Sequence, residues 1–353
     1  MSSVGLNNRL NGFHPIQKLF GNSFFVDLAI DLGTSNIIVA EKNEGIVFNE
    51  PSLIAVENDK PIAIGLKAKN MYGKTPKSVT CVRPLKEGVV ASYDMTKVLL
   101  KQILKNVLPK SFLARPRVVI SVLSGITQVE KRAVIDTAIY AGAKEVHLIE
   151  EPMAAALGIA LPVEENIGNM IIDIGGGTTD IAIIANKSAI YSQSIRVAGD
   201  VMDEAIQTSI QRAFDLQIGI LEAERIKLQI GSAIPSQQKE ITTAYGRSLI
   251  RCLPQKIEVS NFLIEEALKE PISAISAAIV TALEQSDYAV VRDIVERGIY
   301  LTGGGSLLKG LAERLQAELT IDIHTCEEPH LSVIQGLQRI IADIKTNKVY
   351  CAA

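Results

Sequence analysis

The sequence predicts an α/β protein built from two related domains, and three observations lead to this prediction. Strand and helix patterns alternate along most of the chain, as they do in α/β architecture. A pattern of apolar strand, glycine turn and apolar strand occurs at residues 24–40 and again at residues 169–185. The length of 353 residues also corresponds to about two domains at ~100–200 residues each.

The composition is that of a folded protein without a strong excess of positive charge. Hydrophobic residues make up 47% of the chain and charged residues 21%, which excludes global disorder. The 36 basic and 39 acidic residues give a net charge of −3, which argues against a nucleic-acid partner. The sequence contains no run of ~18 apolar residues of the kind that crosses a membrane.

The 4 cysteines are scattered singly, and none has a histidine nearby at zinc-ligand spacing. We therefore expect reduced thiols rather than a disulfide framework or a structural zinc site. Residues 1–20 lack the basic start and the continuous apolar core of a signal peptide. Together these features predict a cytosolic protein.

The first half begins with FFVDLAIDLGTSNIIVA, in which two apolar runs flank a glycine turn and predict a β-hairpin. A polar, lysine-rich stretch follows at residues 58–86. Apolar residues at helical spacing predict a helix over residues 96–108, which Pro109 ends. Pro152 stands where a helix can begin without losing a hydrogen bond. The elements expected between the two prolines are a strand at 117–123, a helix at 128–141 and a strand at 145–149.

The pattern restarts at NMIIDIGGGTTDIAIIA, so that Asp31 and Asp173 occupy equivalent places in the two copies. This internal repeat predicts two related domains that face each other. The segments expected after it are a helix-rich stretch at 200–231, a polar β-rich insertion at 235–254, helices at 262–286 and 290–297, a strand, triple-glycine turn and helix at 298–316, and a final helix at 330–349.

Three glycine turns, at Gly33, at residues 175–177 and at residues 303–305, indicate a bound nucleotide. Glycine lets the backbone approach a ligand closely, so that its N–H groups can point at phosphate oxygens. Hydroxyl donors follow the first two turns, at Thr34, Ser35, Thr178 and Thr179. One such turn is weak evidence, because glycine commonly turns hairpins. Three turns, two of them in repeated positions, predict a nucleotide site.

Asp31 and Asp173 end strands that otherwise bury their side chains. A buried carboxylate is costly unless it is paired or faces a metal. Bound phosphates bring Mg²⁺, which prefers carboxylate and water ligands. We therefore expect the two aspartates to hold hydrated Mg²⁺ beside the phosphates. The alternative is that each aspartate caps its own turn by accepting backbone N–H bonds.

The segments AIDLGTSN, DIGGGTTD and LTGGGSLLKGL resemble the two phosphate loops and the adenosine loop of the MreB family of bacterial actins. That family belongs to the superfamily of actin, heat-shock chaperone ATPases and sugar kinases. The resemblance extends from about Ala29 to Ile341, with IEEPMAAALG, AGDVMDEAI and AERIKLQIG in the family's order. It implies the actin-like ATPase fold, in which two related domains, each with a mixed β-sheet flanked by helices, surround a nucleotide cleft.

The resemblance also implies the division of the chain. We expect an arm at 1–23, a domain I at 24–164 with an insertion at about 51–90, a domain II at 165–336 with an insertion at about 201–261, and a helix and tail at 337–353 that return to domain I.

Individual side chains take their roles from the same resemblance. Glu151 and Thr178 match the pair that positions the attacking water, and the adjacent Glu150 is the competitor for the role of Glu151. Glu224 and Lys227 match contacts to the ribose and adenine, although an i,i+3 ion pair on a solvated helix would otherwise be preferred. The set expected to bind ATP or ADP is Gly33, Thr34, Ser35, Asn36, Gly175, Gly176, Gly177, Thr179, Gly199, Glu224, Lys227, Gly303, Gly304, Gly305 and Ser306.

A membrane contact is implied as well. Phe112 and Leu113 match a loop that carries two large apolar residues in the MreB family, and basic residues surround them. This combination suits insertion between anionic lipid headgroups. The alternative is that both side chains cap the core. Residues 1–22 can form a short amphipathic membrane contact, but a loose terminus or a segment packed on the body is preferred.

The leading hypothesis is an ATP-dependent, filament-forming cytoskeletal protein in the cytoplasm, peripherally associated with the inner face of the cell membrane. Its expected activity is slow Mg²⁺-dependent ATP hydrolysis. Its expected role is in cell shape or, in cells without a wall, in motility. By resemblance its partners are copies of itself in antiparallel double protofilaments, an anionic membrane, and paralogues or envelope-synthesis proteins.

Three alternatives use the same fold. A small-molecule kinase needs a catalytic aspartate and a substrate pocket, which no segment indicates. A chaperone ATPase normally carries a substrate domain after the third glycine turn, and a hydrolysis-dead paralogue would lack Glu151 and Thr178. The chain departs from the family at Asp180, Ser35 and Leu123, where glutamate, alanine and proline are usual. The shorter side chain of Asp180 is expected to affect the hydrolysis rate.

Overall fold

The computed structural model describes residues 26–342 except 59 and 109–114, together with residues 344 and 350. The expected arm at 1–23 and the expected membrane residues Phe112 and Leu113 lie outside the described residues. Within the described part, none of the helices combines the length and the apolar character that a membrane span requires.

Five strands form the sheet of the amino-terminal half: β1 (Asp27–Leu32), β2 (Asn36–Glu41), β3 (Gly45–Pro51), β9 (Arg117–Val122) and β10 (Glu145–Glu150). Their order is β10-β9-β1-β2-β3. β1, β2 and β3 are antiparallel neighbours, whereas β9 and β10 run parallel to β1. Successive side chains of a strand point to opposite faces. Leu28 and Ile30 therefore pack in one core with α3 (Tyr93–Val107) and α4 (Gln128–Ala141), and Ala29 packs in another.

The sheet of the other half repeats this arrangement. Its strands are β11 (Asn169–Ile174), β12 (Thr179–Ala185), β13 (Ser188–Ile195), β17 (Ile299–Thr302) and β18 (Ile323–Thr325), in the order β13-β12-β11-β17-β18. Pairing is again antiparallel from β11 to β13 and parallel from β11 to β18. The register repeats too, because Asp31 lies opposite Ile38 and Asp173 lies opposite Asp180. The prediction of two related domains is confirmed, and their expected boundaries stay a prediction.

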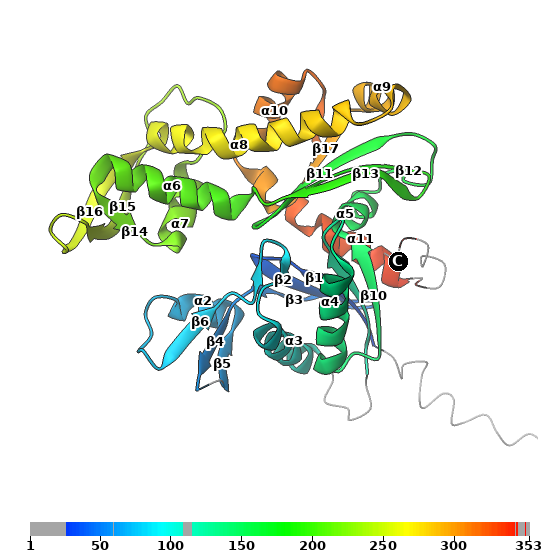
Figure 1. Ribbon diagram of the computed structural model, residues 1–353, viewed down its shortest axis with the longest axis horizontal. Helices are drawn as coiled ribbons and strands as arrows, with labels where there is room; N and C mark the ends of the chain where they lie inside the picture. Colours follow the sequence, from blue (N-terminus) through cyan, green and yellow to red (C-terminus); the bar gives the residue numbers. More distant parts are fainter. Residues whose placement is uncertain (1–25, 59, 109–114, 343, 345–349, 351–353) are drawn as a thin grey trace, which may run out of the picture.

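Helices α5 (Glu151–Gly158) and α11 (Ser332–Ala342) lie between the two sheets (Figure 1). One hydrophobic core contains buried residues of both helices together with Ala29 of the first sheet and Ile171 of the second. The two halves of the protein are therefore joined by a shared core rather than by a flexible linker alone.

The contact between these two helices depends on two glycines. A Cβ atom on Gly158 would overlap the carbonyl oxygen of Ser332, and a Cβ atom on Gly336 would overlap that of Ala154. No other residue type lets the two backbones approach so closely. The packing of α5 against α11 thus fixes how the two halves meet.

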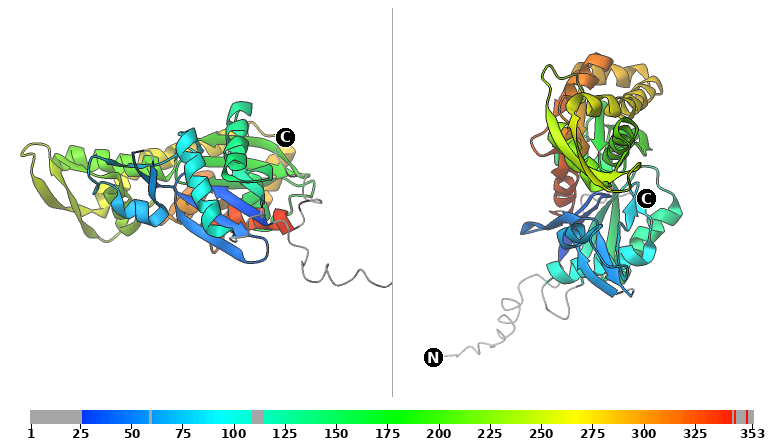
Figure 2. Two further views of the ribbon diagram at one scale, coloured as in Figure 1. Left: turned by 90° about the horizontal axis from the view of Figure 1, so that it is seen from below. Right: turned by 90° about the vertical axis from the view of Figure 1, so that its left-hand side faces the viewer.

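Each half carries a small inserted sheet, and both lie on the same side of the molecule (Figures 1 and 2). The first contains β4 (Ile54–Glu57), β5 (Lys60–Ile64) and β6 (Val79–Val82) with α2 (Gly65–Met71), followed by the hairpin of β7 (Leu85–Lys86) and β8 (Val89–Val90). The second contains β14 (Leu216–Ile218), β15 (Ile241–Ser248) and β16 (Pro254–Ser260) with α7 (Ile220–Ile230). Helices α2 and α7 face each other across the space between the insertions, where Lys69 contacts Glu224.

The remaining helices belong to the second half. Helices α6 (Gly199–Phe214) and α8 (Asn261–Glu284) share a core with β11 and β12 on the outer face of the second sheet. The other elements are α9 (Tyr288–Arg297), α10 (Leu311–Leu319) and the 3₁₀ turns η1 (Gly304–Leu307) and η2 (Pro329–Leu331).

The sequence pattern located the strongly periodic elements best. The helix expected at 128–141 coincides with α4, which begins with a capping box between Thr127 and Glu130 and ends at Gly142 with φ of 118°. Strands β3 and β13 were not expected, because they carry mixed, partly exposed residues without a clear apolar alternation. The short elements in the polar stretch at 58–86 were not expected for the same reason.

We expect Gly336→Ala to lower the free energy of unfolding by about 1–3 kcal/mol, because the added methyl group must push α11 away from α5. The midpoint of urea unfolding, followed by circular dichroism, measures the change. Gly219→Ala is the matched control, since a Cβ atom there meets nothing within 4 Å. Equal shifts for both variants would contradict the requirement for glycine in the helix contact.

Candidate functional site

A cavity of about 440 Å³ lies between the two sheets. Its volume falls within the range of about 300–1,000 Å³ that is usual for small-molecule sites. Its walls come from all three glycine turns and from α5, α6, α7 and η2. The sequence-predicted residues that line it are Asp31, Gly33, Thr34, Ser35, Asn36, Glu151, Asp173, Gly175, Gly176, Gly177, Thr178, Gly199, Glu224, Lys227, Gly303, Gly304 and Gly305.

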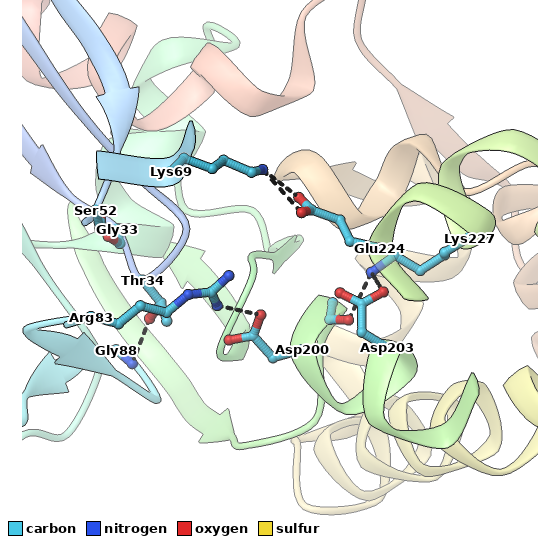
Figure 3. Close-up of polar contacts among 11 residues, drawn as sticks. Gly33, Thr34, Ser52, Lys69, Arg83, Gly88, Asp200, Asp203, Glu224 and Lys227 are labelled. Atoms are coloured by element: carbon cyan, nitrogen blue, oxygen red, sulfur yellow. Dashed lines mark hydrogen bonds and ion pairs between the residues drawn. The ribbon is translucent and has the colours of Figure 1, made fainter. Parts of the chain in front are cut away.

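The first two glycine turns meet tip to tip. A Cβ atom on Gly176 would overlap the Oγ of Ser35, and one on Gly177 would lie only 2.7 Å from the Oγ1 of Thr34. The backbone N–H of Gly88 donates to Thr34 Oγ1 at 2.9 Å (Figure 3). A hydroxyl oxygen that accepts a hydrogen bond can still donate its own hydrogen, so Thr34 can also donate to an anionic ligand.

The second turn is held by the beginning of helix α6. The backbone N–H of Asp200 donates to the carbonyl oxygen of Gly176 at 2.7 Å, and that of Gly199 donates to Gly175 at 3.3 Å. Inside the turn, the N–H of Gly175 donates to the carbonyl oxygen of Thr178 at 2.8 Å. The turn therefore has a fixed shape before any ligand arrives.

Two residues predicted to contact the nucleotide, Thr179 and Ser306, direct their hydroxyls to the backbone. Thr179 is fully buried and its Oγ1 donates to the carbonyl oxygen of Val197 at 2.7 Å. Ser306 Oγ donates to the carbonyl oxygen of Gly303 at 2.6 Å. Neither residue lines the cavity. Both hydroxyls are used to hold a loop, which the letters of a glycine-rich motif do not reveal.

The structure separates the two adjacent glutamates. Glu151 is the first residue of α5 and lines the cavity, whereas Glu150 ends β10 and does not. The carboxylate of Glu150 accepts a hydrogen bond from Ser124 Oγ at 3.2 Å. Of the two candidates, Glu151 is therefore the one that can reach a ligand.

Four carboxyl groups lie near one another, those of the buried Asp173 and Asp180 and of the partly buried Asp31 and Glu151, and the neighbouring aspartates raise the pKa of Asp173 and of Glu151. Burial raises the pKa of Asp173 to about 8, and repulsion from Asp180 and Asp31 adds to it. Burial likewise raises the pKa of Asp31 to about 6, against a hydrogen bond from Ser121, and that of Asp180 to about 6. For Glu151, burial and the three aspartates raise the pKa well above its ordinary value.

This cluster suits a cation that brings its own water. In the part of the chain that is described, no three His, Cys, Asp or Glu side chains converge on a point that could hold a metal ion. A divalent ion near Asp31 and Asp173 would take most of its ligands from water and from a bound phosphate. The charge of such an ion would offset both the burial and the mutual repulsion of the carboxylates.

Glu224 and Lys227 both line the cavity, but each has a different partner from the one that helical spacing suggests (Figure 3). Glu224 accepts two hydrogen bonds from Lys69 Nζ, at 3.0 and 3.2 Å. Lys227 Nζ contacts Asp203 Oδ1 at 2.9 Å and donates to the carbonyl oxygen of Gly199 at 2.7 Å. The i,i+3 ion pair is thus replaced by two contacts that shape the cavity.

Sequence reasoning missed part of the cavity wall, mostly apolar. Leu228 and Leu307 line the cavity and are 78% and 62% exposed although they are large and hydrophobic. Their surfaces are therefore available to a flat ligand. An exposed leucine carries no signal in the sequence, since it resembles any other helix or turn residue. The lining residues not predicted are Ile38, Gly88, Met202, Leu228, Gln229, Gly231, Leu307, Leu308, Lys309, Pro329, His330 and Val333.

The family model for MreB/Mbl proteins matches residues 25–349 of the chain. The cell shape-determining protein MreB of Escherichia coli strain K12 is 44% identical over 326 residues, which cover 90% of this chain and 94% of that relative. The cell shape-determining protein Mbl of Bacillus subtilis strain 168 is 39% identical over 308 residues, which cover 87% of this chain and 92% of that relative.

Solved structures agree with these relatives. The crystal structure of MreB5 of Spiroplasma citri bound to AMPPNP matches with a TM-score of 0.87 and 32% identity, covering 92% of this chain and 98% of that one. The same protein bound to ADP matches equally well. The MamK double helical filament, at 21% identity and a TM-score of 0.76 over 89% of this chain and 98% of that one, shows the same fold. The predicted actin-like fold is confirmed.

The carboxyl cluster predicts how the ligand-free protein responds to pH. The pKa of Asp173 is about 8 in the folded state and near 4 in the unfolded state. Between about pH 4 and pH 8 the folded state therefore binds more protons than the unfolded state, and the free energy of unfolding falls as pH rises. In chelator-containing buffer, Asp173→Asn should reduce the loss of unfolding free energy between pH 6 and pH 8 by on the order of 1–2 kcal/mol. Urea unfolding at both pH values measures this. An unchanged pH dependence would contradict the proton-binding role of Asp173.

Proposed function

The chain belongs to the MreB/Mbl family, and from this membership and its cavity we propose that it is an ATP-binding and ATP-hydrolysing, filament-forming cytoskeletal protein that acts in cell shape. One observation carries the proposal: three glycine turns from two repeated sheets converge on a single cavity of nucleotide size. The solved relative from Spiroplasma citri, described with AMPPNP and with ADP, supports a nucleotide as the ligand.

We propose that the first two turns hold the β- and γ-phosphates. Their backbone N–H groups and the hydroxyls of Thr34 and Ser35 are the donors at that end of the cavity, which Thr178 also lines. The third turn, with Glu224 and Lys227, takes the ribose and the base. The exposed apolar surfaces of Leu228 and Leu307 suit an aromatic base there.

Asp31 and Asp173 are the proposed neighbours of hydrated Mg²⁺, which when bound neutralises phosphate charge. The fit rests on the donor set, because both carboxylates line the cavity and both have a raised pKa that nearby positive charge would lower. Thr302 Oγ1 donates to Asp173 at 3.3 Å, and Ser121 Oγ donates to Asp31 at 2.8 Å, so each carboxylate is held in place.

For hydrolysis, Glu151 and Thr178 are proposed to orient the attacking water. A carboxylate must be ionised to accept a hydrogen bond from water on both oxygens. Burial and the three aspartates raise the pKa of Glu151, and the positive charge of a Mg²⁺ ion held beside Asp31 and Asp173 would favour its ionised form. Its backbone begins α5, and the glycine contacts with α11 at Ala154 and Gly158 hold that helix in place. Its placement in line with the γ-phosphate would then set the rate.

Copies of the same chain are the proposed filament partner, with antiparallel double protofilaments as the arrangement. Paralogues or envelope-synthesis proteins are further proposed partners. Hydrolysis in the cleft between domain I (24–164) and domain II (165–336) would alter how these domains close and so alter the filament.

Glu151→Ala should lower the rate of phosphate release from ATP at least about 100-fold while leaving nucleotide affinity nearly unchanged, because only the orientation of water is lost. Phosphate release is followed in parallel with pelleting and electron microscopy of the protein with ATP and Mg²⁺. We expect filaments from both proteins, and hydrolysis from the unsubstituted protein alone.

Glu150→Gln is the matched control, since its side chain contacts Ser124 and not the cavity, and it should keep the hydrolysis rate within about threefold. Phosphate release without filaments, even on anionic lipid, would contradict the cytoskeletal role and favour a small-molecule kinase. Phosphorylated product from a mixture of ATP and sugars would then identify that activity.

We also propose that Phe112 and Leu113 anchor filaments to an anionic membrane surface at the inner face of the cell membrane. Replacing both residues by serine removes the apolar surface that inserts, so cosedimentation with vesicles containing anionic lipid should fall at least about tenfold. Polymerisation in solution, measured by light scattering, serves as the control and should be unchanged. Vesicle binding equal to that of the unsubstituted protein would rule out this anchor.

A further inference from the structure

We propose that two ion pairs that join the two halves beside the cavity, Lys69–Glu224 and Arg83–Asp200, retain the bound nucleotide and that Lys69 and Arg83 thereby set the rate at which ADP leaves. Both pairs join the insertion of the first half to helices of the second half (Figure 3). The inference rests on the proposed nucleotide site, and it assigns a function to two residues that no glycine turn includes.

The first pair contains a residue of the cavity wall. Lys69 on α2 reaches both carboxylate oxygens of Glu224 on α7, at 3.0 and 3.2 Å. The two side chains are only 32% and 30% exposed, so the pair is partly shielded from solvent. A carboxylate has acceptor sites to spare, so Glu224 can contact Lys69 and a ribose hydroxyl together. Lys69 also offsets a negative charge that would otherwise repel the nucleotide.

The second pair reaches the phosphate end. Arg83 follows β6, and its Nη1 lies 3.1 Å from Oδ1 of Asp200, with side chains 27% and 28% exposed. Asp200 is the second residue of α6, and its backbone N–H holds the carbonyl oxygen of Gly176 in the second turn. Arg83 is therefore connected to the phosphate turn through a single residue.

A third pair gives an internal comparison. Arg196, just after β13, lies 2.8 Å from Glu87 in the β7–β8 turn, and thus also joins the two halves. Its guanidinium side chain is 68% exposed, more than twice as much as that of Arg83. Exposed pairs contribute less, because water and salt screen them. Substitution of Lys69 or Arg83 should therefore change the rate of ADP release more than substitution of Arg196.

The position of the pairs explains why they would act on release. Glu224 and Gly199, next to Asp200, line the cavity, so a nucleotide beneath them leaves when α2 and β6 separate from α7 and α6. Separation breaks both pairs at once. The core around α5 and α11 contains none of the four residues of these pairs, so it need not be disturbed.

The test is the release of a fluorescent ADP, chased by excess unlabelled ADP in a stopped-flow instrument, at protein concentrations below those that give filaments. Lys69→Gln and Arg83→Gln should each speed release roughly threefold, and the double variant roughly tenfold. Raising salt until the Debye length falls from about 30 Å to about 3 Å should speed release from the unsubstituted protein and have little effect on the double variant.

Asp200→Asn, combined with Arg83→Gln, completes a double-mutant cycle. If the pair is responsible, the double substitution releases ADP no faster than either single one. Lys187→Gln is the matched control, because it breaks a pair of similar length, 3.2 Å to Glu164, whose residues do not line the cavity. Its release rate should equal that of the unsubstituted protein.

The outcomes separate this proposal from the function on which it rests. Faster release with unchanged thermal midpoint and association rate supports retention by the ion pairs. Release at the unsubstituted rate from the Lys69→Gln/Arg83→Gln protein overturns it, as does equal acceleration by Lys187→Gln. Failure of the unsubstituted protein to bind labelled ADP at all would instead contradict the nucleotide site.

Discussion

The close contact of α5 with α11 is the constraint on which the rest of the structure depends. The carbonyl oxygens of Ala154 and Ser332 occupy the space that side chains at Gly336 and Gly158 would need. The two helices therefore form one layer, and each sheet packs on a side of it. Because Glu151 begins α5 and the glycine turns end strands of the two sheets, this layer sets where the chemical groups meet.

The fold could be predicted where a repeated pattern or strong periodicity was present. Two hairpins with the same apolar-Asp-x-Gly motif indicated the duplicated sheets, and the helix expected at 128–141 coincides with α4. The edge strands β3 and β13 could not be predicted, since their residues alternate weakly between the surface and the interior. The short strands in the polar stretch at 58–86 could not be predicted for the same physical reason.

The candidate site likewise has a part that could be predicted from the sequence and a part that could not. Glycine residues mark these backbone turns in the local sequence, so most cavity-lining positions could be predicted from the sequence. Contacts between distant side chains could not: nothing near Lys69 or Glu224 in the chain points to the other residue. Thr179 and Ser306 were assigned to the ligand because the motif contains them, whereas their hydroxyls hold the carbonyl oxygens of Val197 and Gly303. A motif specifies a loop but not the direction of every side chain in it.

The repeated register has a consequence for how the ligand lies. Ile38 and Asp180 are opposite the equivalent aspartates of the two hairpins, so the same place is apolar in one copy and acidic in the other. Ile38 lines the cavity and Asp180 does not. A site made of two identical copies would have pseudo-twofold symmetry and could accept a ligand in either direction. This divergence, together with the third glycine turn, which lines the cavity from the second half alone, makes the two sides of the site different, so a molecule whose two ends differ meets different groups in its two orientations.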